Sequence, residues 1–167
     1  MIEFMLIAAP RCGTTWAANW MTTDTTMCLH DPLYKHHYTE LDDIKSSKVL
    51  GVSCTGLYNF PGWVNSHPAR KVILHRPLHE INESMAAIGL PTIHANDVAR
   101  LDQIEGLHLD WRAMFDDPKP MYEYLTRKEF DAERHAELKD IEMQPNFAGL
   151  SVGKEVTRRF IEELMRI

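Results

Sequence analysis

The stretch Ala9-Pro10-Arg11-Cys12-Gly13-Thr14-Thr15-Trp16 decides the fold that this sequence predicts. It follows Ile2 to Ala8, a nearly continuous apolar run typical of a strand that is buried on both faces. It then leads into Thr14 to Met21, which has a helical pattern. A strand that turns through glycine into a helix presents unpaired N–H groups at the positive end of the helix dipole. The stretch therefore predicts an anion-binding loop between a first strand and a first helix.

The rest of the chain continues this alternation of strands and helices. Such alternation forms parallel βαβ units, with helices on both faces of the sheet. The sequence therefore predicts one α/β domain over residues 1–167, a three-layer α/β/α arrangement with a parallel sheet and a P-loop-like fold. Further strands are expected at Lys48 to Thr55, Lys71 to His75 and Leu107 to Trp111, and helices at Pro61 to Ser66 and Leu78 to Ile88. A loop is expected at Thr22 to Thr26, and Asp31-Pro32 is expected to stop the element that Met27 begins. The remainder, Pro120 to Ile167, is expected to be helical apart from a loop at Gln144 to Leu150.

Composition places the chain among ordinary globular proteins. It is 44% hydrophobic and 25% charged, and no apolar run approaches the ~20 residues of a membrane span. The N-terminal segment carries Glu3 and no basic region, so we expect a strand there and no signal peptide. Three cysteines without a CxxC pair indicate neither a disulfide framework nor a zinc site, which fits a reducing cytoplasm. The net charge of -6 argues against a general nucleic-acid surface but allows a small anionic ligand.

The residues of the loop suit phosphate or sulfonate oxygens. Gly13 lets the backbone approach an anion closely, Thr14 and Thr15 add hydroxyl donors, and Arg11 adds a permanent positive charge. In the nucleotide-triphosphate loop GxxxxGK[ST], a lysine follows the second glycine directly. Here Thr14 stands at that lysine position and Ala8 at the first glycine, so the usual phosphate contact of a kinase or ATPase is missing. The alternative is a strand–turn–helix corner in which Gly13 only solves a backbone problem.

The segment Pro10 to Trp16 resembles the 5′-phosphosulfate loop of the sulfotransferase family, usually written P-K-S-G-T-T-W. In that family the loop binds 3′-phosphoadenosine 5′-phosphosulfate. Arginine replaces the lysine here, as it does in many relatives, and Cys12 replaces the serine at a similar size. Weaker resemblances to the family lie at Leu107 to Pro118, at Phe130-Asp131-x-x-Arg134 and at Gly149 to Lys154.

A second match to the family lies at the strand expected at Lys71 to His75. In sulfotransferases this strand ends in an arginine, a serine follows eight positions later, and both hold the 3′-phosphate. Here Arg76 follows the strand and Ser84 lies eight residues further on. The alternative is that Arg76 pairs with Glu80 or Glu83 and that Ser84 is an ordinary helix residue.

The resemblance implies an enzyme that moves a sulfuryl group from 3′-phosphoadenosine 5′-phosphosulfate to a hydroxyl or amine acceptor. It implies no metal, and neither nucleic acid nor membrane is expected as a partner. The chain is shorter than typical members, so we expect reduced acceptor-binding insertions, and the acceptor itself is not indicated. Arg11 would also stabilise the transferring group during catalysis. The residues implied to bind the co-substrate are Arg11, Cys12, Gly13, Thr14, Thr15, Trp16, Arg76 and Ser84.

A general base is needed for the hydroxyl of the acceptor. Some sulfotransferases use a histidine, and several others use a glutamate soon after the first helix. The segment Leu29 to Leu33 occupies that second location, where Asp31 matches the acidic position and His30 is its neighbour. We predict Asp31 as the base, with His30 as the reserve candidate because a histidine titrates closer to neutral pH.

Other interpretations of these residues remain open. His30, Asp31, His36 and His37 could form a metal cluster, although their spacing fits no standard zinc pattern, or His36 and His37 could simply be exposed. Trp16 and Trp20 lie four residues apart on the first helix, which favours core packing over base stacking. The alternative functions are a nucleotide or small-molecule kinase with a P-loop, and a non-catalytic nucleotide-binding module of the same fold.

Overall fold

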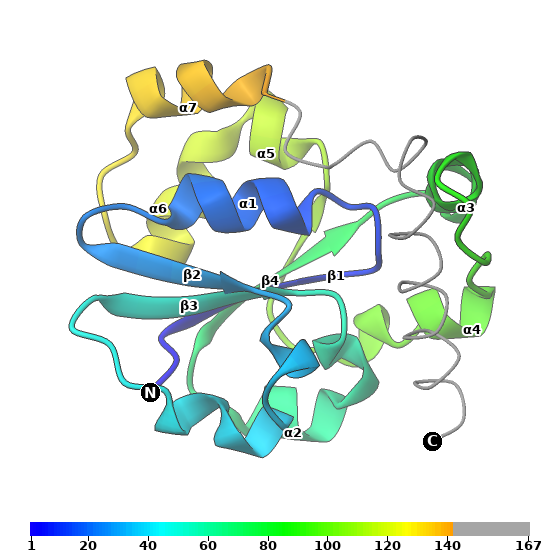
Figure 1. Ribbon diagram of the computed structural model, residues 1–167, viewed down its shortest axis with the longest axis horizontal. Helices are drawn as coiled ribbons and strands as arrows, with labels where there is room; N and C mark the ends of the chain where they lie inside the picture. Colours follow the sequence, from blue (N-terminus) through cyan, green and yellow to red (C-terminus); the bar gives the residue numbers. More distant parts are fainter. Residues whose placement is uncertain (142–167) are drawn as a thin grey trace.

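A five-stranded parallel sheet forms the centre of the protein, in the strand order β2-β3-β1-β4-β5 (Figure 1). The computed structural model describes residues 1–141. The central strand is β1 (Phe4–Ala8), and all five of its residues are buried, as its apolar sequence predicts. The other strands are β2 (Thr26–His30), β3 (Val49–Cys54), β4 (Arg70–His75) and β5 (Leu107–Asp110).

Helices cover both faces of this sheet, so the protein has the predicted α/β architecture in three layers (Figure 1). Helix α1 packs on β2 and β3, and α6 packs on β1 and β4, on the face where α5 and α7 also lie. Helix α2 lies on the opposite face, and α3 and α4 lie beyond the carboxyl ends of the central strands. The helices are α1 (Thr14–Met21), α2 (Pro61–Ser66), α3 (Leu78–Ala87), α4 (Ala95–Val98), α5 (Ala113–Asp116), α6 (Pro118–Thr126) and α7 (Ala132–Lys139). Short 3-10 helices are η1 (Pro32–Tyr34), η2 (Tyr38–Asp43), η3 (Leu57–Asn59) and η4 (Leu101–Gln103).

Most predicted elements are confirmed, and two predictions are wrong. The ranges Thr14–Met21 and Pro61–Ser66 are helices with the predicted bounds. Thr26 belongs to strand β2 and not to a loop, because this edge strand pairs along its whole length with β3. The helix expected from Pro120 onward is interrupted between Thr126 and Ala132, because Arg127 takes a left-handed conformation that ends α6. The expected loop Gln144 to Leu150 and the segment Gly149 to Lys154 lie outside the described residues.

The core lies on both sides of β1. On the α1 face, the side chains of Trp16 and Trp20 pack against each other and against His135, which confirms that both tryptophans are core residues. On the sheet itself, Phe4 pairs with Gly51 of β3, and the Phe4 ring fills the space where a Cβ of Gly51 would lie.

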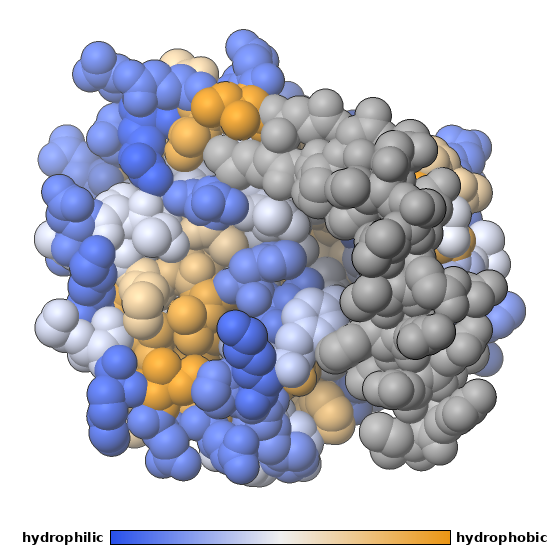
Figure 2. All heavy atoms as spheres, viewed as in Figure 1, coloured by the Kyte–Doolittle hydropathy of each residue, from blue (hydrophilic) through white to orange (hydrophobic). Residues whose placement is uncertain are grey.

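The outer surface is mixed in character. Figure 2 shows hydrophilic side chains around much of the rim of this view, and apolar ones over the β2–β3 edge of the sheet. None of the described helices has the length and apolar character that crossing a membrane requires.

Candidate functional site

The candidate site lies at the carboxyl ends of the parallel strands, which all meet at one edge of the sheet. The chain places β3 on one side of β1 and β4 on the other, so the strand order reverses around β1. In open α/β sheets, ligands bind outside the carboxyl ends of the strands at such a reversal. The loop after β1, the first residues after β2, β3 and β4, and helix α3 all reach this edge.

The loop after β1 has the backbone shape of an anion-binding turn. Arg11 and Gly13 both have positive φ angles, of 67° and 80°. Gly13 is also the N-cap of α1 and supplies no side-chain cap, so the first N–H groups of the helix are directed into the loop. The φ of Gly13 lies in the left-handed region that favours glycine, whereas a Cβ there would meet only Cε of Met114, the end of a flexible side chain, at 2.8 Å. Ser53 of β3 anchors the helix, because its hydroxyl donates to the carbonyl of Thr14 at 2.9 Å.

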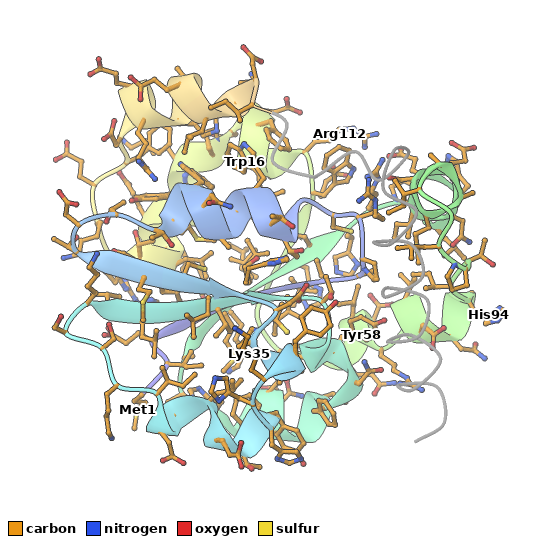
Figure 3. All side chains as sticks on the ribbon, viewed as in Figure 1. Met1, Trp16, Lys35, Tyr58, His94 and Arg112 are labelled. Atoms are coloured by element: carbon orange, nitrogen blue, oxygen red, sulfur yellow. The ribbon has the colours of Figure 1, made fainter. Side chains whose placement is uncertain are left out.

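Cys12 and Trp16 contribute to the loop from inside the protein. Cys12 is fully buried, and burial raises the pKa of its thiol to about 12, so the sulfur stays protonated and uncharged. Trp16 lies between α1 and helices α5 and α7 (Figure 3), and its Nε1 donates to the carbonyl of Leu138 at 2.9 Å. Only 6% of Trp16 is exposed, so its indole holds α1 in place and does not face the edge of the sheet.

Arg11 connects the two parts of the site that lie far apart in the sequence. Its Nε donates to the hydroxyl of Ser84 on α3 at 2.9 Å, and its carbonyl accepts a hydrogen bond from Nη1 of Arg76. The structure therefore brings Arg11, Arg76 and Ser84 together. Burial and the neighbouring Arg76 lower the pKa of Arg11 from its ordinary value, which reflects the proximity of two positive charges. Such a pair of cations favours an anion beside it.

A carboxylate also binds Arg76. Its Nε lies 3.1 Å from Oε2 of Glu80, so the ion pair considered as an alternative from the sequence is present. The other oxygen of Glu80 lies 2.7 Å from Nη2 of Arg112. Hydrogen bonds from Arg112 and Arg76 hold the pKa of Glu80 below its usual range, so the carboxylate is charged and bridges two guanidinium groups.

Trp111 and Arg112 are site residues that the sequence did not point out individually. The indole of Trp111 contacts two guanidinium groups, with its ring centroid 4.4 Å from that of Arg76 and 5.1 Å from that of Arg112. Figure 3 shows Arg112 at the side of the molecule where α5 and α3 face each other. Both residues follow β5 directly. Like Arg76, they therefore lie just beyond the end of a strand, where candidate site residues are expected.

His30 and Asp31 lie on the opposite side of the loop, at the end of β2. Nε2 of His30 lies 3.2 Å from Oδ2 of Asp31, 3.1 Å from Oγ1 of Thr15 and 3.4 Å from Oγ1 of Thr14. Asp31 has a positive φ of 41° and is only 8% exposed, whereas His30 is exposed. Oδ1 of Asp31 accepts two hydrogen bonds from Thr55, from its N–H at 2.6 Å and from its hydroxyl at 3.1 Å. Asp31 is thus held rigidly, and His30 is the more accessible of the two.

His36 and His37 do not join this group. Both are exposed, and Nδ1 of His37 lies 2.8 Å from the hydroxyl of Thr39. Among the described residues, His30, Asp31, His36 and His37 do not form a group with ligand atoms close enough to hold one ion.

Comparisons of this chain with protein-family models, with curated proteins and with solved structures find no match.

Proposed function

We propose that this chain is a sulfotransferase, which moves a sulfuryl group from 3′-phosphoadenosine 5′-phosphosulfate to a hydroxyl or amine acceptor. The observation that supports this most is the contact between the two matched segments. Arg11 of the loop hydrogen-bonds Ser84 through its side chain and Arg76 through its carbonyl, although these residues lie more than sixty positions away in the sequence. A ligand with phosphates at both ends of a nucleoside needs two such anion-binding positions close to one another.

The loop after β1 would hold the 5′-phosphosulfate. The N–H groups at the start of α1 and the hydroxyl of Thr15 are suited to its oxygens, and Arg11 adds a charge that strengthens as the leaving phosphate becomes more negative. Arg76 and Ser84 would hold the 3′-phosphate. Because Glu80 forms an ion pair with Arg76, a bound phosphate would take the place of that carboxylate.

His30 is the base that the geometry favours, with Asp31 as the residue that orients it. Oδ1 of Asp31 accepts two hydrogen bonds from Thr55, and Oδ2 faces Nε2 of His30. An Nε2–H that donates to the hydroxyl of Thr15, beside the carboxylate of Asp31, leaves Nδ1 with a lone pair for the proton of the acceptor. As the acceptor oxygen bonds to sulfur, the bond from sulfur to the bridging oxygen breaks. Adenosine 3′,5′-bisphosphate then leaves, and the proton stays on His30.

A non-catalytic nucleotide-binding module is the second candidate. The ion pair between Glu80 and Arg76 supports it, because this pair already satisfies one of the two arginines assigned to the donor. A kinase has less support, since Thr14 stands where the phosphate-binding lysine would be.

Ligand binding followed by a transfer assay distinguishes these functions. Thermal unfolding and calorimetry would be carried out in EDTA with adenosine 3′,5′-bisphosphate and with 5′-AMP, and separately with magnesium and ATP. Binding of the bisphosphate without metal, together with transfer of labelled sulfate to an acceptor from a phenol, alcohol and amine panel, is the expected result. Binding without transfer would favour the non-catalytic module. Stabilisation by magnesium-ATP alone would favour the kinase.

A further inference from the structure

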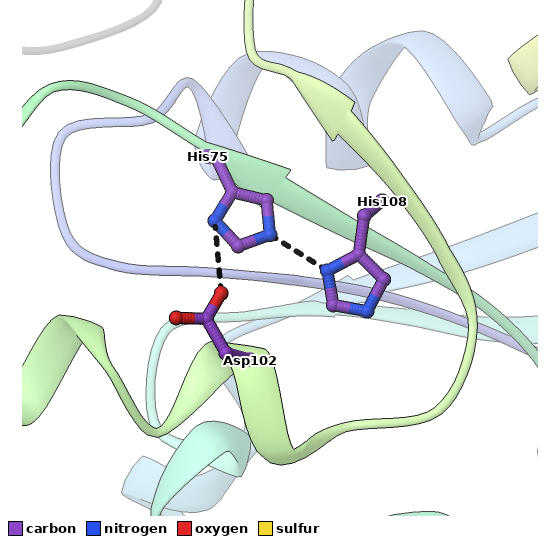
Figure 4. Close-up of side chains that lie close together, drawn as sticks. All are labelled: His75, Asp102 and His108. Atoms are coloured by element: carbon purple, nitrogen blue, oxygen red, sulfur yellow. Dashed lines mark hydrogen bonds and ion pairs between the residues drawn. The ribbon is translucent and has the colours of Figure 1, made fainter.

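Three side chains from three different elements gather at the β4–β5 side of the sheet. They are His75 at the end of β4, His108 in β5 and Asp102 in η4 (Figure 4). Their ligand atoms all lie within 4.8 Å of one another. Nε2 of His75 is 2.8 Å from Nδ1 of His108, and Nδ1 of His75 is 3.9 Å from Oδ1 of Asp102.

The parallel register explains why the two histidines meet. Ile73 pairs with His108 and His75 pairs with Asp110, so His75 and His108 lie diagonally across the same pair of strands. Side chains two residues apart on a strand point to the same face, which places both imidazoles on one face. The chain reaches β5 from η4, which brings Asp102 toward the same face (Figure 4).

A backbone carbonyl fixes the tautomer of His108. Nε2 of His108 lies 2.8 Å from the carbonyl oxygen of Ile104, and a carbonyl can only accept a hydrogen bond. Nε2 therefore carries the hydrogen, and Nδ1 presents its lone pair to His75. Histidines that bind metals are typically oriented in this way, with the second ring nitrogen donating to a carbonyl or a carboxylate.

We propose that His75, His108 and Asp102 bind one divalent transition-metal ion, with zinc as the expected ion and water completing its coordination. Two imidazole nitrogens and one carboxylate oxygen form a donor set that suits zinc and its neighbours better than magnesium or calcium. At Zn–N distances of ~2.0–2.1 Å, tetrahedral coordination separates the two nitrogens by about 3.3 Å. The two rings therefore need to separate by about half an ångström from their hydrogen-bonded positions, and Nε2 of His75 releases to solvent the proton that it donates to His108. Oδ1 of Asp102, which is exposed and lies 3.9 Å from Nδ1 of His75, also moves toward the ion.

Such an ion would join the crossover segment to the outer strand of the sheet. β5 pairs only with β4 in the described sheet, and His75 lies directly before Arg76 of the candidate site. A metal shared by β4, β5 and η4 would stiffen this edge of the sheet. The proposal does not depend on the sulfotransferase function, because none of the three residues is assigned a role in it.

The test is calorimetric titration of the full, untagged chain with ZnCl₂ after treatment with EDTA and removal of the chelator. We expect one zinc equivalent. Both His75→Ala and His108→Ala should weaken binding at least ~10-fold, and Asp102→Asn should weaken it by a smaller factor because a neutral amide oxygen replaces the carboxylate. The double variant His36→Ala/His37→Ala is the matched control, since it removes two exposed imidazoles elsewhere, and it should bind zinc as the parent does.

Two results would overturn the site. One is unchanged zinc affinity in His108→Ala, and the other is loss of binding in the His36→Ala/His37→Ala control. His108 and Asp102 are both exposed, so their variants should keep the circular dichroism and the unfolding midpoint of the parent in EDTA. If His75→Ala fails this folding check, His108→Ala and Asp102→Asn decide the question. Equal binding of MgCl₂ at the same concentration would also contradict the proposed donor set.

Discussion

At the scale of single residues, Arg11 connects the parts of the candidate site. Its backbone has a φ of 67°, in a region that non-glycine residues occupy at a cost of roughly 1–3 kcal/mol. The hydrogen bonds to Ser84 and from Arg76 help to hold this conformation. The conformation of the loop is therefore supported by contacts with residues much later in the chain.

Replacing Arg76 tests the 3′-phosphate position. Arg76→Ala should weaken binding of adenosine 3′,5′-bisphosphate by about 1.5–3 kcal/mol, the range for a hydrogen bond to a charged group. It should change the affinity for 5′-AMP much less, because that ligand has no 3′-phosphate. Calorimetry with both ligands measures the difference, and Arg127→Ala, at an exposed arginine after α6, is the matched control. Equal losses for the two ligands would contradict the assignment.

The roles of His30 and Asp31 can be separated by two substitutions. His30→Ala should retain donor affinity and lose ~10²-fold or more in turnover, which is the usual contribution of a general base. Asp31→Asn should lose less turnover but also some stability, because Thr55 would lose a charged acceptor. The measurements are steady-state kinetics, nucleotide affinity and denaturant unfolding. Full activity in His30→Ala together with an inactive Asp31→Asn would give the role of the base to Asp31, as the sequence alone suggests.

At the scale of elements, helix α7 holds the C-terminal end of helix α1. The guanidinium of Arg134 donates to the carbonyls of Asn19, Trp20 and Thr22, at the C-terminal end of α1 where carbonyls lack their full set of intrahelical partners. Asp131 caps α7 by accepting the N–H of Arg134 at 2.9 Å. The segment Phe130 to Arg134 thus has a structural role, since it fixes the helix whose other end forms the loop.

The contact between β1 and β3 is sensitive to the size of the side chain at position 51. Gly51→Ala should destabilise the protein by about 1–3 kcal/mol, because the new Cβ would overlap the Phe4 ring at the centre of the sheet. Gly62→Ala is the matched control. A Cβ there meets nothing within 4 Å, and Gly62 lies in α2, where alanine is the better helix former. Denaturant unfolding measures both variants, and similar midpoints for the two would show that Phe4 relaxes without cost.

Elements differ in how well the sequence predicts them. Ile2 to Ala8 and Thr14 to Met21 are predictable because a fully buried strand, a glycine turn and a helix each leave a strong local pattern. Strand β2 is not predictable in this way, because an edge strand of five residues with alternating exposure leaves no such local pattern. The interruption after Thr126 depends on one left-handed residue, Arg127, which is neither glycine nor asparagine.

The residues of the candidate site also differ in how well the sequence predicts them. Arg11 could be found because it follows a strand end, and Arg76 and Ser84 because their spacing after a later strand resembles the sulfotransferase pattern. Thr55, Trp111 and Arg112 also follow strands, but their roles depend on distances between elements, and residue order does not contain these distances. The hydrogen bond from Arg11 to Ser84 joins the two predicted positions through a contact that the sequence did not predict.

At the scale of the whole molecule, the proposed ligand should stabilise the folded state. A ligand that binds only the native protein adds about 2.7 kcal/mol to the free energy of unfolding at 100 times its Kd. We therefore expect the unfolding midpoint to rise with the concentration of adenosine 3′,5′-bisphosphate in EDTA. The same titration with Arg76→Ala should require a higher concentration for an equal rise. A midpoint that does not change at any concentration would contradict nucleotide binding.

The contact of Trp111 with two guanidinium groups has an optical consequence. Indole fluorescence responds to nearby charge, and Arg76 and Arg112 lie 4.4 Å and 5.1 Å from this ring. Two of the protein's four tryptophans, Trp16 and Trp20, lie in α1 and are buried in the core. An anion that draws Arg76 away from the indole would change the emission of Trp111 first. The protein therefore carries its own reporter of events at the edge of the sheet, without any attached dye.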